Sequence, residues 1–370
     1  MSPFDPSKYT RQIEESRRRL EITVCFQEPD RVPIRISTSG SYYCRLFGYN
    51  IRDYYTDLDC ALQVDLKGRE WAFEQLQDDR TGYGISLQLG PVYEGLLFDC
   101  EIVYPDDTSP WIVPRLETEA DVDRLEVPDP ASHPQVQRAY RLAEQLQEKA
   151  ARMGLDIPVG GGFGIHPPLS CACAIMPPEK VYEYMYTNPP LVHKLFRKLF
   201  EAFCRLQDYE DAYFGVKKRT SLGLADDNSA FISPQMYKEF VYPYNKALYD
   251  RYGSERRHLH ADGPNDHHFR MYANEMKLTE MDIGGFSDLA NAKREMGGKV
   301  VISGGLNNRD FYGTWEQAKQ AIERAIRIGA PGGGFILAIG GETYYGVPPD
   351  YLIRAVNYAK EIGRYPISVK

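Results

Sequence analysis

The second half of the chain alternates short apolar runs with helix-forming stretches, and this alternation restricts the fold more than any other feature. Several of the runs end in Asp, His, Gly or Asn directly after the last apolar residue. Buried parallel strands have this pattern, because helices cover both faces of a parallel sheet. The runs after residue 155 are DIPVGGGFG (156–164), SLGLADD (221–227), RHLHADG (257–263), LTEMDIGG (278–285), KVVISGGLN (299–307) and GGFILAIGG (333–341).

Two further strands in the first part of the chain bring the total to about eight. VPIRI (32–36) alternates as a strand does, and a second strand is expected within 82–105. The pattern predicts an α/β fold of the (β/α)8 TIM-barrel type with an elaborated N-terminal part. A doubly wound open sheet is the alternative architecture. We expect a single domain over residues 1–370, with an N-terminal helical extension over about 1–28.

Charge and hydropathy exclude several classes of function. The 370 residues contain 44 Lys and Arg against 52 Asp and Glu, a formal net charge of −8. Nucleic-acid grooves and anionic membrane surfaces require a basic face, so neither is an expected partner. The polar N-terminus lacks an apolar signal core, and the seven scattered cysteines suit reduced thiols. We therefore expect a soluble, cytoplasmic protein.

The Cys171-Ala-Cys173 pair is the closest pair of thiols in the chain. On a strand, residues i and i+2 share a face, so the two thiolates can in principle meet one metal ion. The alternative is that both are small apolar residues in a packed segment.

Residues that end the strands are the candidates for the site, because the active site of a barrel lies at the carboxyl ends of its strands. These residues are unusually acidic: Asp226, Asp227, His260, Asp262, Asp282, Asn307, Asn308 and Glu342. Each has a structural alternative, since an Asp or Asn after a strand often only caps the next helix.

His260-Ala-Asp262 is the strongest local signal. At i and i+2 both side chains face the same side, so an imidazole and a carboxylate can share one metal ion or one proton. Glu342 is the predicted third ligand. A hydrogen-bonded pair that only shapes the rim is the alternative. Alternation also places Arg35 opposite Ile34, where it can bind a carboxylate or form a structural ion pair.

The order of several motifs resembles the uroporphyrinogen decarboxylase superfamily. The likeness runs from about Arg11 to Pro366, and its members are (β/α)8 barrels. The motifs are PDRVPIR (29–35), PVYEGLLFDCEIVYPDD (91–107), LADDNSAFISPQMYKEFVYPYNKAL (224–248), HLHADG (258–263), VVISGGLNN (300–308) and GGFILAIGGE (333–342).

The superfamily implies two chemistries. One is cofactor-free decarboxylation of a tetrapyrrole's acetate groups, and its arginine-rich RxAGRY-type signature is replaced here by RISTSGSYY (35–43). The other is methyl transfer to or from a corrinoid cobalt, assisted by zinc on a His-x-Cys pair and a later Cys. His260 matches the first ligand, whereas Asp262 replaces one Cys and Gly340 or Gly341 the other. The resemblance to the methyltransferase branch is greater. A histidine with carboxylates is a harder set of ligands than one with thiolates, so the resemblance does not decide whether the metal is zinc.

The leading hypothesis is a methyltransferase that moves a methyl group between a small donor, a methyl ether or a methylamine, and a corrinoid on a partner protein. His260, Asp262 and Asp227 are its predicted catalytic residues, with His260, Asp262 and Glu342 as metal ligands. Arg35, Glu94, Asp226, Tyr344 and Asn307 are predicted to contact the substrate. A carboxy-lyase acting on a porphyrin or another polycarboxylate is the alternative, and a non-catalytic corrinoid-binding barrel is the third hypothesis. A homodimer is compatible with the resemblance, but no interface is visible.

Overall fold

The computed structural model describes residues 4–367. The predicted N-terminal extension over about 1–28 therefore lies within the described part from residue 4 onward. It contains a 3-10 turn, η1 (Pro6–Tyr9), and helix α1 (Thr10–Val24).

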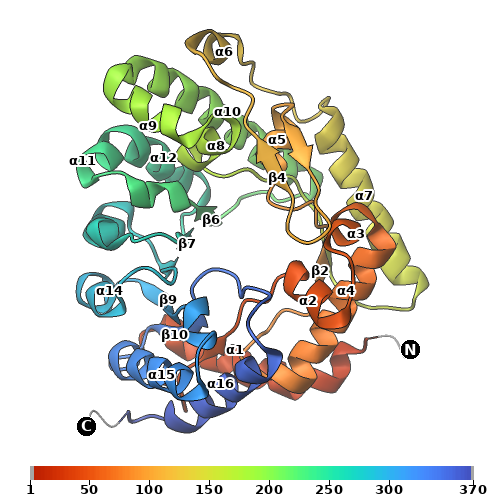
Figure 1. The fold of residues 1–370 in the computed structure, drawn as a ribbon, viewed down its shortest axis with the longest axis vertical. Helices are drawn as coiled ribbons and strands as arrows, with labels where there is room; N and C mark the ends of the chain where they lie inside the picture. Colours follow the sequence, from red (N-terminus) through yellow and green to blue (C-terminus); the bar gives the residue numbers. More distant parts are fainter. Residues whose placement is uncertain (1–3, 368–370) are drawn as a thin grey trace.

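Eight parallel strands form the centre of the molecule, and helices surround them (Figure 1). Six of them hydrogen-bond in the order β1-β10-β9-β8-β7-β6, and β2 pairs with β5. The first strand therefore pairs with the last, as a barrel requires. The strands are β1 (Ile34–Arg35), β2 (Ile85–Ser86), β5 (Val159–Gly160), β6 (Ser221–Ala225), β7 (Arg256–His260), β8 (Glu280–Asp282), β9 (Val301–Leu306) and β10 (Phe335–Ile339).

These strands confirm the predicted α/β alternation, including all six runs after residue 155. The segment 82–105 contributes two strands of different kinds. One is the parallel strand β2, and the other is β3 (Glu101–Val103), which forms an antiparallel hairpin with β4 (Trp111–Val113). This hairpin is part of the expected elaboration of the N-terminal half.

The helices alternate with the strands, with additional short helices in the N-terminal half. Before β6 they are α2 (Gly40–Phe47), α3 (Ile51–Thr56), α4 (Leu58–Trp71), the π turn η2 (Ala72–Leu76), α5 (Tyr93–Leu97), α6 (Glu119–Arg124), α7 (Pro134–Arg152), α8 (Pro168–Ile175), α9 (Pro178–Thr187) and α10 (Pro189–Tyr213). After β6 they are η3 (Asp227–Phe231), α11 (Pro234–Met236), η4 (Tyr237–Val241), α12 (Tyr242–Tyr252), η5 (Asp266–His268), α13 (Phe269–Met271), η6 (Tyr272–Met276), α14 (Leu289–Met296), η7 (Asn308–Phe311), α15 (Trp315–Gly329) and α16 (Pro349–Ile362).

Helix α15 illustrates how the sequence specifies these helices. Thr314 caps its N-terminus, and Gln317 completes a capping box. Its buried residues recur at a helical period, from Ala318 through Ile322 to Ile326, and form one apolar face against the strands. The helical segment after η3 also begins with a capping residue, since the Ser233 hydroxyl accepts from the Met236 N–H. A π turn, η4, divides that segment into two helices.

Hydrogen bonding around the ring of strands has two gaps in the described residues, so the predicted barrel is not closed by a continuous ladder. The first lies between β1 and β2. There the backbone N–H of Ile34 donates to Asp79 at 2.8 Å, and that of Ile36 donates to Asp78 at 2.9 Å. Carboxylates thus replace a neighbouring strand as the acceptors for the edge of β1.

The second gap lies between β5 and β6. β5 is only two residues long, ends in Gly160 and is followed by Gly161 and Gly162, which have no side chains to pack and so weaken a strand. A cavity of about 420 Å³ lies between this segment and β6. This gap is called the seam below.

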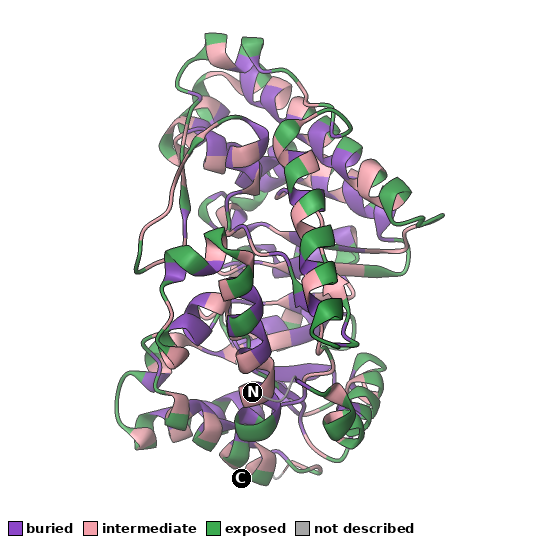
Figure 2. Ribbon diagram, turned by 90° about the vertical axis from the view of Figure 1, so that its right-hand side faces the viewer, coloured by how far each residue is buried: buried purple, intermediate pink, exposed green. Residues whose placement is uncertain are grey.

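Buried residues lie along the sides of the helices that face the interior of the molecule, and exposed residues along their outer sides (Figure 2). The main core includes Leu222, Leu224, Leu259, Met281 and Ile302 from consecutive strands. Among the described helices, none is at once long and apolar enough for a bilayer crossing.

A buried ion network fastens α1 to the start of β1. Asp79 is 1% exposed and accepts from Arg19 at 2.6 Å, from Arg31 at 2.6 Å and from the Ile34 N–H. The two guanidinium groups satisfy a carboxylate that would otherwise be buried without compensation.

We expect Asp79→Ala to lower the free energy of unfolding by about 3–5 kcal/mol, because two partly buried arginines lose their shared partner. Urea unfolding followed by circular dichroism measures this. Glu15→Ala removes an exposed ion pair with Arg11 and should change stability by less than about 0.5 kcal/mol. Equal effects of the two substitutions would contradict the assigned role.

Candidate active site

The parallel register of β6, β7 and β8 brings three strand ends together. Ala225 pairs with His260, and His260 pairs with Asp282. Alternation along β7 turns Arg256, His258 and His260 toward the interior, while Leu259 is buried on the opposite side. The imidazole of His260 therefore stands at the carboxyl end of the sheet, beside the residues that follow β6.

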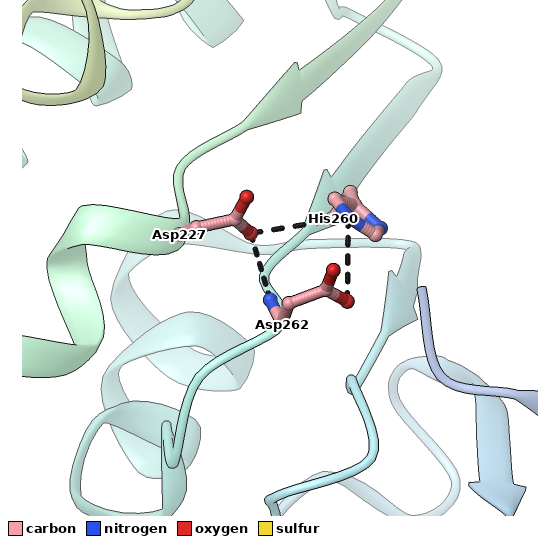
Figure 3. A group of neighbouring side chains, drawn as sticks. All are labelled: Asp227, His260 and Asp262. Carbon is pink, nitrogen blue, oxygen red and sulfur yellow. Dashed lines mark hydrogen bonds and ion pairs between the residues drawn. The ribbon is translucent and has the colours of Figure 1, made fainter. Parts of the chain in front are cut away.

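Asp227, His260 and Asp262 form a group whose ligand atoms lie within 4.8 Å of one another (Figure 3). The Nε2 atom of His260 is 3.4 Å from Asp262 Oδ1 and 3.8 Å from Asp227 Oδ1. The Asp262 N–H donates to Asp227 Oδ1 at 2.7 Å, which holds the two loops together. All three side chains are partly accessible, so a ligand can reach them.

Asp282 orients the histidine from the other side. Its Oδ2 lies 3.1 Å from Nδ1 of His260, so Nε2 faces Asp227 and Asp262. Partial burial alone would lower the pKa of His260, but the Asp262 and Asp282 carboxylates raise it to about 11. Without a bound cation, His260 is therefore an imidazolium among three carboxylates.

The donor set fits a divalent cation. One imidazole nitrogen and two carboxylate oxygens are ligands for zinc and for harder divalent metals. Asp262 Oδ1 and Asp282 Oδ1 are buried and make no hydrogen bond, so each has capacity for a further partner. A cation at this position would displace the Nε2 proton, and its affinity would rise with pH.

Glu342, the predicted third ligand, lies outside this group, and Asp227 occupies its place. The Glu342 backbone carbonyl accepts from Asn308, and surrounding protein raises the pKa of its carboxyl group. Glycines bring the loop after β10 close to Asp262: a Cβ at Gly341 would lie 2.6 Å from Asp262 Oδ2. The position that the family resemblance assigns to the second cysteine is thus adjacent to Asp262.

Asp226 lies beneath the site and not in it. It is fully buried and accepts from the Ser170 hydroxyl at 2.7 Å and from the Asn245 amide at 2.9 Å. In this structure Asp226 therefore presents no accessible atom to a substrate. Its bonds to α8 and α12 instead fix the end of β6, immediately before Asp227.

Two other predicted substrate residues have structural partners. Asn307 caps η7, and its amide donates to the Gly285 carbonyl at 2.8 Å, so it has the capping role stated above as the alternative. Tyr344 is 47% exposed on the loop after β10, and its ring centroid lies 4.1 Å from that of Tyr345, with the ring planes tilted by 34°. Tyr344 is accessible at the rim but does not contact the Asp227–His260–Asp262 group by any hydrogen bond in the described residues.

Glu94 is buried and pairs with a residue that sequence reasoning did not single out. Its Oε1 accepts from the His166 backbone N–H at 2.5 Å and lies 2.6 Å from His166 Nδ1. Burial lowers the pKa of His166, but Glu94, together with Asp227 and Asp226, raises it overall. The only sequence signal for this pair was a lone histidine in an uncharged, glycine-rich stretch.

The interior of the strand ring is a charged hollow of about 590 Å³. Arg35 lines this hollow, as alternation predicted, whereas Ile34 is buried and does not line it. Arg80 pairs with Asp78 at 2.5 Å, and Arg256 pairs with Glu280 at 2.9 Å. Within residues 4–367, Arg35 and Arg69 also line the hollow and form no ion pair with a carboxylate.

Cys171 and Cys173 lie in helix α8 and not on a strand. Residues i and i+2 of a helix point in different directions, so the two thiols do not converge on one ligand. Burial raises the pKa of both. They are packed residues, as the structural alternative stated.

Comparisons with known proteins agree with this architecture. A family model described as uroporphyrinogen decarboxylase (URO-D) matches residues 17–362. The uroporphyrinogen decarboxylase of Trichodesmium erythraeum (strain IMS101) is 23% identical over 331 residues, covering 80% of this chain and 87% of that protein. That of Shewanella piezotolerans (strain WP3 / JCM 13877) is 24% identical over 197 residues, which is 53% of its length.

A solved structure described as a methyltransferase from Methanosarcina mazei has the same fold. It superposes with a TM-score of 0.68 at 16% sequence identity, over 94% of this chain and 98% of the other. At this level of identity the likeness concerns the fold.

We expect chelator-washed protein reloaded with zinc to retain about one ion per chain, measured by plasma mass spectrometry. His260→Ala and Asp227→Ala should lose it, because each removes one of three converging ligands. Glu342→Ala is the matched control and should retain it. Loss of the ion in Glu342→Ala with retention in Asp227→Ala would contradict the geometry.

Asp226 predicts a specific pH dependence of stability. Burial raises its pKa to about 6 from 3.8, so the folded state holds more protons than the unfolded state between these values. The free energy of unfolding should therefore fall as pH rises through this range, by up to about 3 kcal/mol from this group.

Asp226→Asn should remove this pH dependence. The Asn245 Oδ1 atom has no hydrogen-bond partner and can accept from the new amide after the Asn245 side chain rotates. Urea unfolding of both proteins at pH 4.5 and pH 7 tests this. Identical pH dependence in the two proteins would show that folding does not raise the pKa of Asp226.

Proposed function

Because the chain belongs to the uroporphyrinogen decarboxylase family, we propose that it is an enzyme of the methyltransferase branch of that family. In this proposal it moves a methyl group between a small methylated donor and a corrinoid carried by a partner protein. The observation that carries it is the environment of His260, an accessible imidazole held among three carboxylates at the carboxyl ends of the strands. The methyltransferase from Methanosarcina mazei, which shares the fold, supports the same direction.

The chain's own residues suit activation of a leaving heteroatom. Asp227, His260 and Asp262 would hold a divalent metal, which when bound supplies a Lewis acid for the departing oxygen or nitrogen. Asp282 keeps Nε2 of His260 directed at this position in either state. In the metal-free state the imidazolium is itself a proton donor at Nε2.

A corrinoid on the partner would supply the cobalt nucleophile that accepts the methyl group. The acidic strand ends leave no cationic group beside His260 among the residues that contact it, so an anionic reacting group is disfavoured there. A neutral or cationic methyl donor is thus favoured at this position.

A carboxy-lyase is the second candidate, and the charged hollow favours it. Decarboxylation of a polycarboxylate needs cations that bind the carboxylates, and Arg35 and Arg69 face the hollow without a carboxylate partner in the described residues. The curated relatives named above are uroporphyrinogen decarboxylases. Asp227 and His260 would then be proton-handling groups.

We expect the purified enzyme with cob(I)alamin and a panel of methyl ethers and methylamines to form methylcobalamin, followed by absorbance. His260→Ala should lower the rate at least about 100-fold, because it removes the acid or metal ligand at the leaving atom. His133→Ala is the control and should retain activity, since His133 precedes α7 outside the strand ring and forms no cap hydrogen bond.

Carbon dioxide release from uroporphyrinogen, with no methyl transfer from any donor, would replace the proposal with the second candidate. Unchanged methyl transfer in His260→Ala would exclude the assigned role of the histidine group.

A further inference from the structure

The seam between β5 and β6 holds a cavity that the proposed site does not use. It measures about 420 Å³, within the range of about 300–1,000 Å³ typical of small-molecule sites. Its walls are mostly apolar and aromatic: Tyr93, Phe163, Phe203, Leu206, Leu222 and Leu224. The Tyr93 and Phe163 rings meet edge to face at 5.1 Å.

One end of this cavity carries a built polar group. Glu94 is 1% exposed and contacts the backbone N–H and the Nδ1 atom of His166. The His166 side chain is 39% exposed and lines the cavity. Because Nδ1 is engaged by Glu94, Nε2 is the ring atom left for a ligand. Burying the Glu94 carboxylate costs desolvation free energy. A role in positioning the accessible imidazole explains this burial better than packing does.

The same end adjoins the His260 group. Ala225 lines the cavity and is followed directly by Asp226 and Asp227. Ser170, one helical turn beyond the His166 loop, bonds to Asp226. A ligand in the seam that reaches Nε2 of His166 therefore has its end close to the carboxyl end of β6.

Two further polar residues line the cavity, and their side chains already have partners. Gln207 and Glu210 of α10 line it, and Glu210 pairs with Arg219 at 2.9 Å. A cationic ligand would give up its hydration among apolar side chains without a free carboxylate in this cavity. A flat, uncharged ring with oxygen substituents matches the walls and the imidazole.

We propose that the seam cavity binds the uncharged aromatic body of an oxygen-substituted ring, with His166 Nε2 hydrogen-bonded to a ring oxygen and Glu94 as the positioning residue. This inference rests on the proposed function and narrows it, because it selects an aryl methyl ether over a methylamine as the methyl donor. Nε2 serves either protonation state, as donor to an ether oxygen or as acceptor from a phenolic hydroxyl.

Two glycines provide a matched pair of blocking variants. No heavy atom lies within 4 Å of a Cβ built at Gly164 or at Gly82, and neither has a positive φ. Gly164 lines the seam cavity, whereas Gly82 lines the charged hollow. Gly164→Phe therefore fills the seam, and Gly82→Phe adds the same side chain to the hollow.

The experiment measures binding of guaiacol (2-methoxyphenol) and of tetramethylammonium by isothermal titration calorimetry, without corrinoid. We expect guaiacol to bind the wild type more tightly than tetramethylammonium. Gly164→Phe should weaken guaiacol binding at least about tenfold, and Gly82→Phe should change it by less than about twofold. His166→Gln should also weaken it.

A second readout separates ligand contact from a structural role. In protein with ¹⁵N-labelled histidine, guaiacol should shift the His166 Nε2 resonance, assigned by its absence in His166→Gln. Gly164→Phe should abolish the shift. The proposal would be overturned if guaiacol did not bind the wild type. It would also be overturned if Gly82→Phe abolished guaiacol binding and Gly164→Phe retained it.

These outcomes are distinct from a failure of the proposed function. Methyl transfer from a methylamine that persists in Gly164→Phe would leave the methyltransferase assignment standing and reject the seam as donor site. Guaiacol binding with the expected losses, but no methyl transfer from any donor, would reject the function and retain the site.

Discussion

The parallel ladder from β6 through β10 to β1 is the constraint on which the rest of the structure depends. Parallel pairing places the carboxyl ends of all six strands at one edge, and register decides which residues meet there. His260 is level with Ala225 on one side and with Asp282 on the other. A shift of one residue in β7 would turn His260 outward and Leu259 inward, so the core and the site are specified by the same hydrogen bonds.

Where the ladder is interrupted, side chains supply polar contacts in place of a neighbouring strand. Asp78 and Asp79 accept the N–H groups of β1, and Asp79 also binds the two arginines that attach α1. At the seam, Glu94 and His166 occupy the interval before β6. Unlike ordinary barrel interiors, which are filled by layers of apolar side chains, this interior has paired charges around an open hollow. Buried ion pairs often stabilise a protein less than packed apolar side chains of similar volume. They leave this interior polar, so that it can bind a ligand.

Burial separates two neighbouring carboxylates with different roles. Asp226 is enclosed and held by Ser170 and Asn245, so burial raises its pKa to about 6. Asp227, the next residue, is partly exposed and faces His260. The first anchors the end of β6 to the helices, and the second is available to a proton, a cation or a ligand. Two consecutive residues thus have different roles: Asp226 supports the site, and Asp227 is part of it.

The amino-acid sequence by itself determined the α/β alternation, the strand positions and the pairing of His260 with Asp262, because these depend on local periodicity. The inward face of Arg35 and the cap at Ser233 follow from the same local rules. Only the tertiary structure decided that Asp227 replaces Glu342 beside His260, that Asp226 is buried, that Asn307 is a cap, and that Glu94 meets His166. The Asp227–His260 and Glu94–His166 pairs each join residues more than 30 positions apart in the chain. The physical reason is that periodicity assigns a side chain to a face, whereas its partners are chosen by strand register and loop packing across the whole ring.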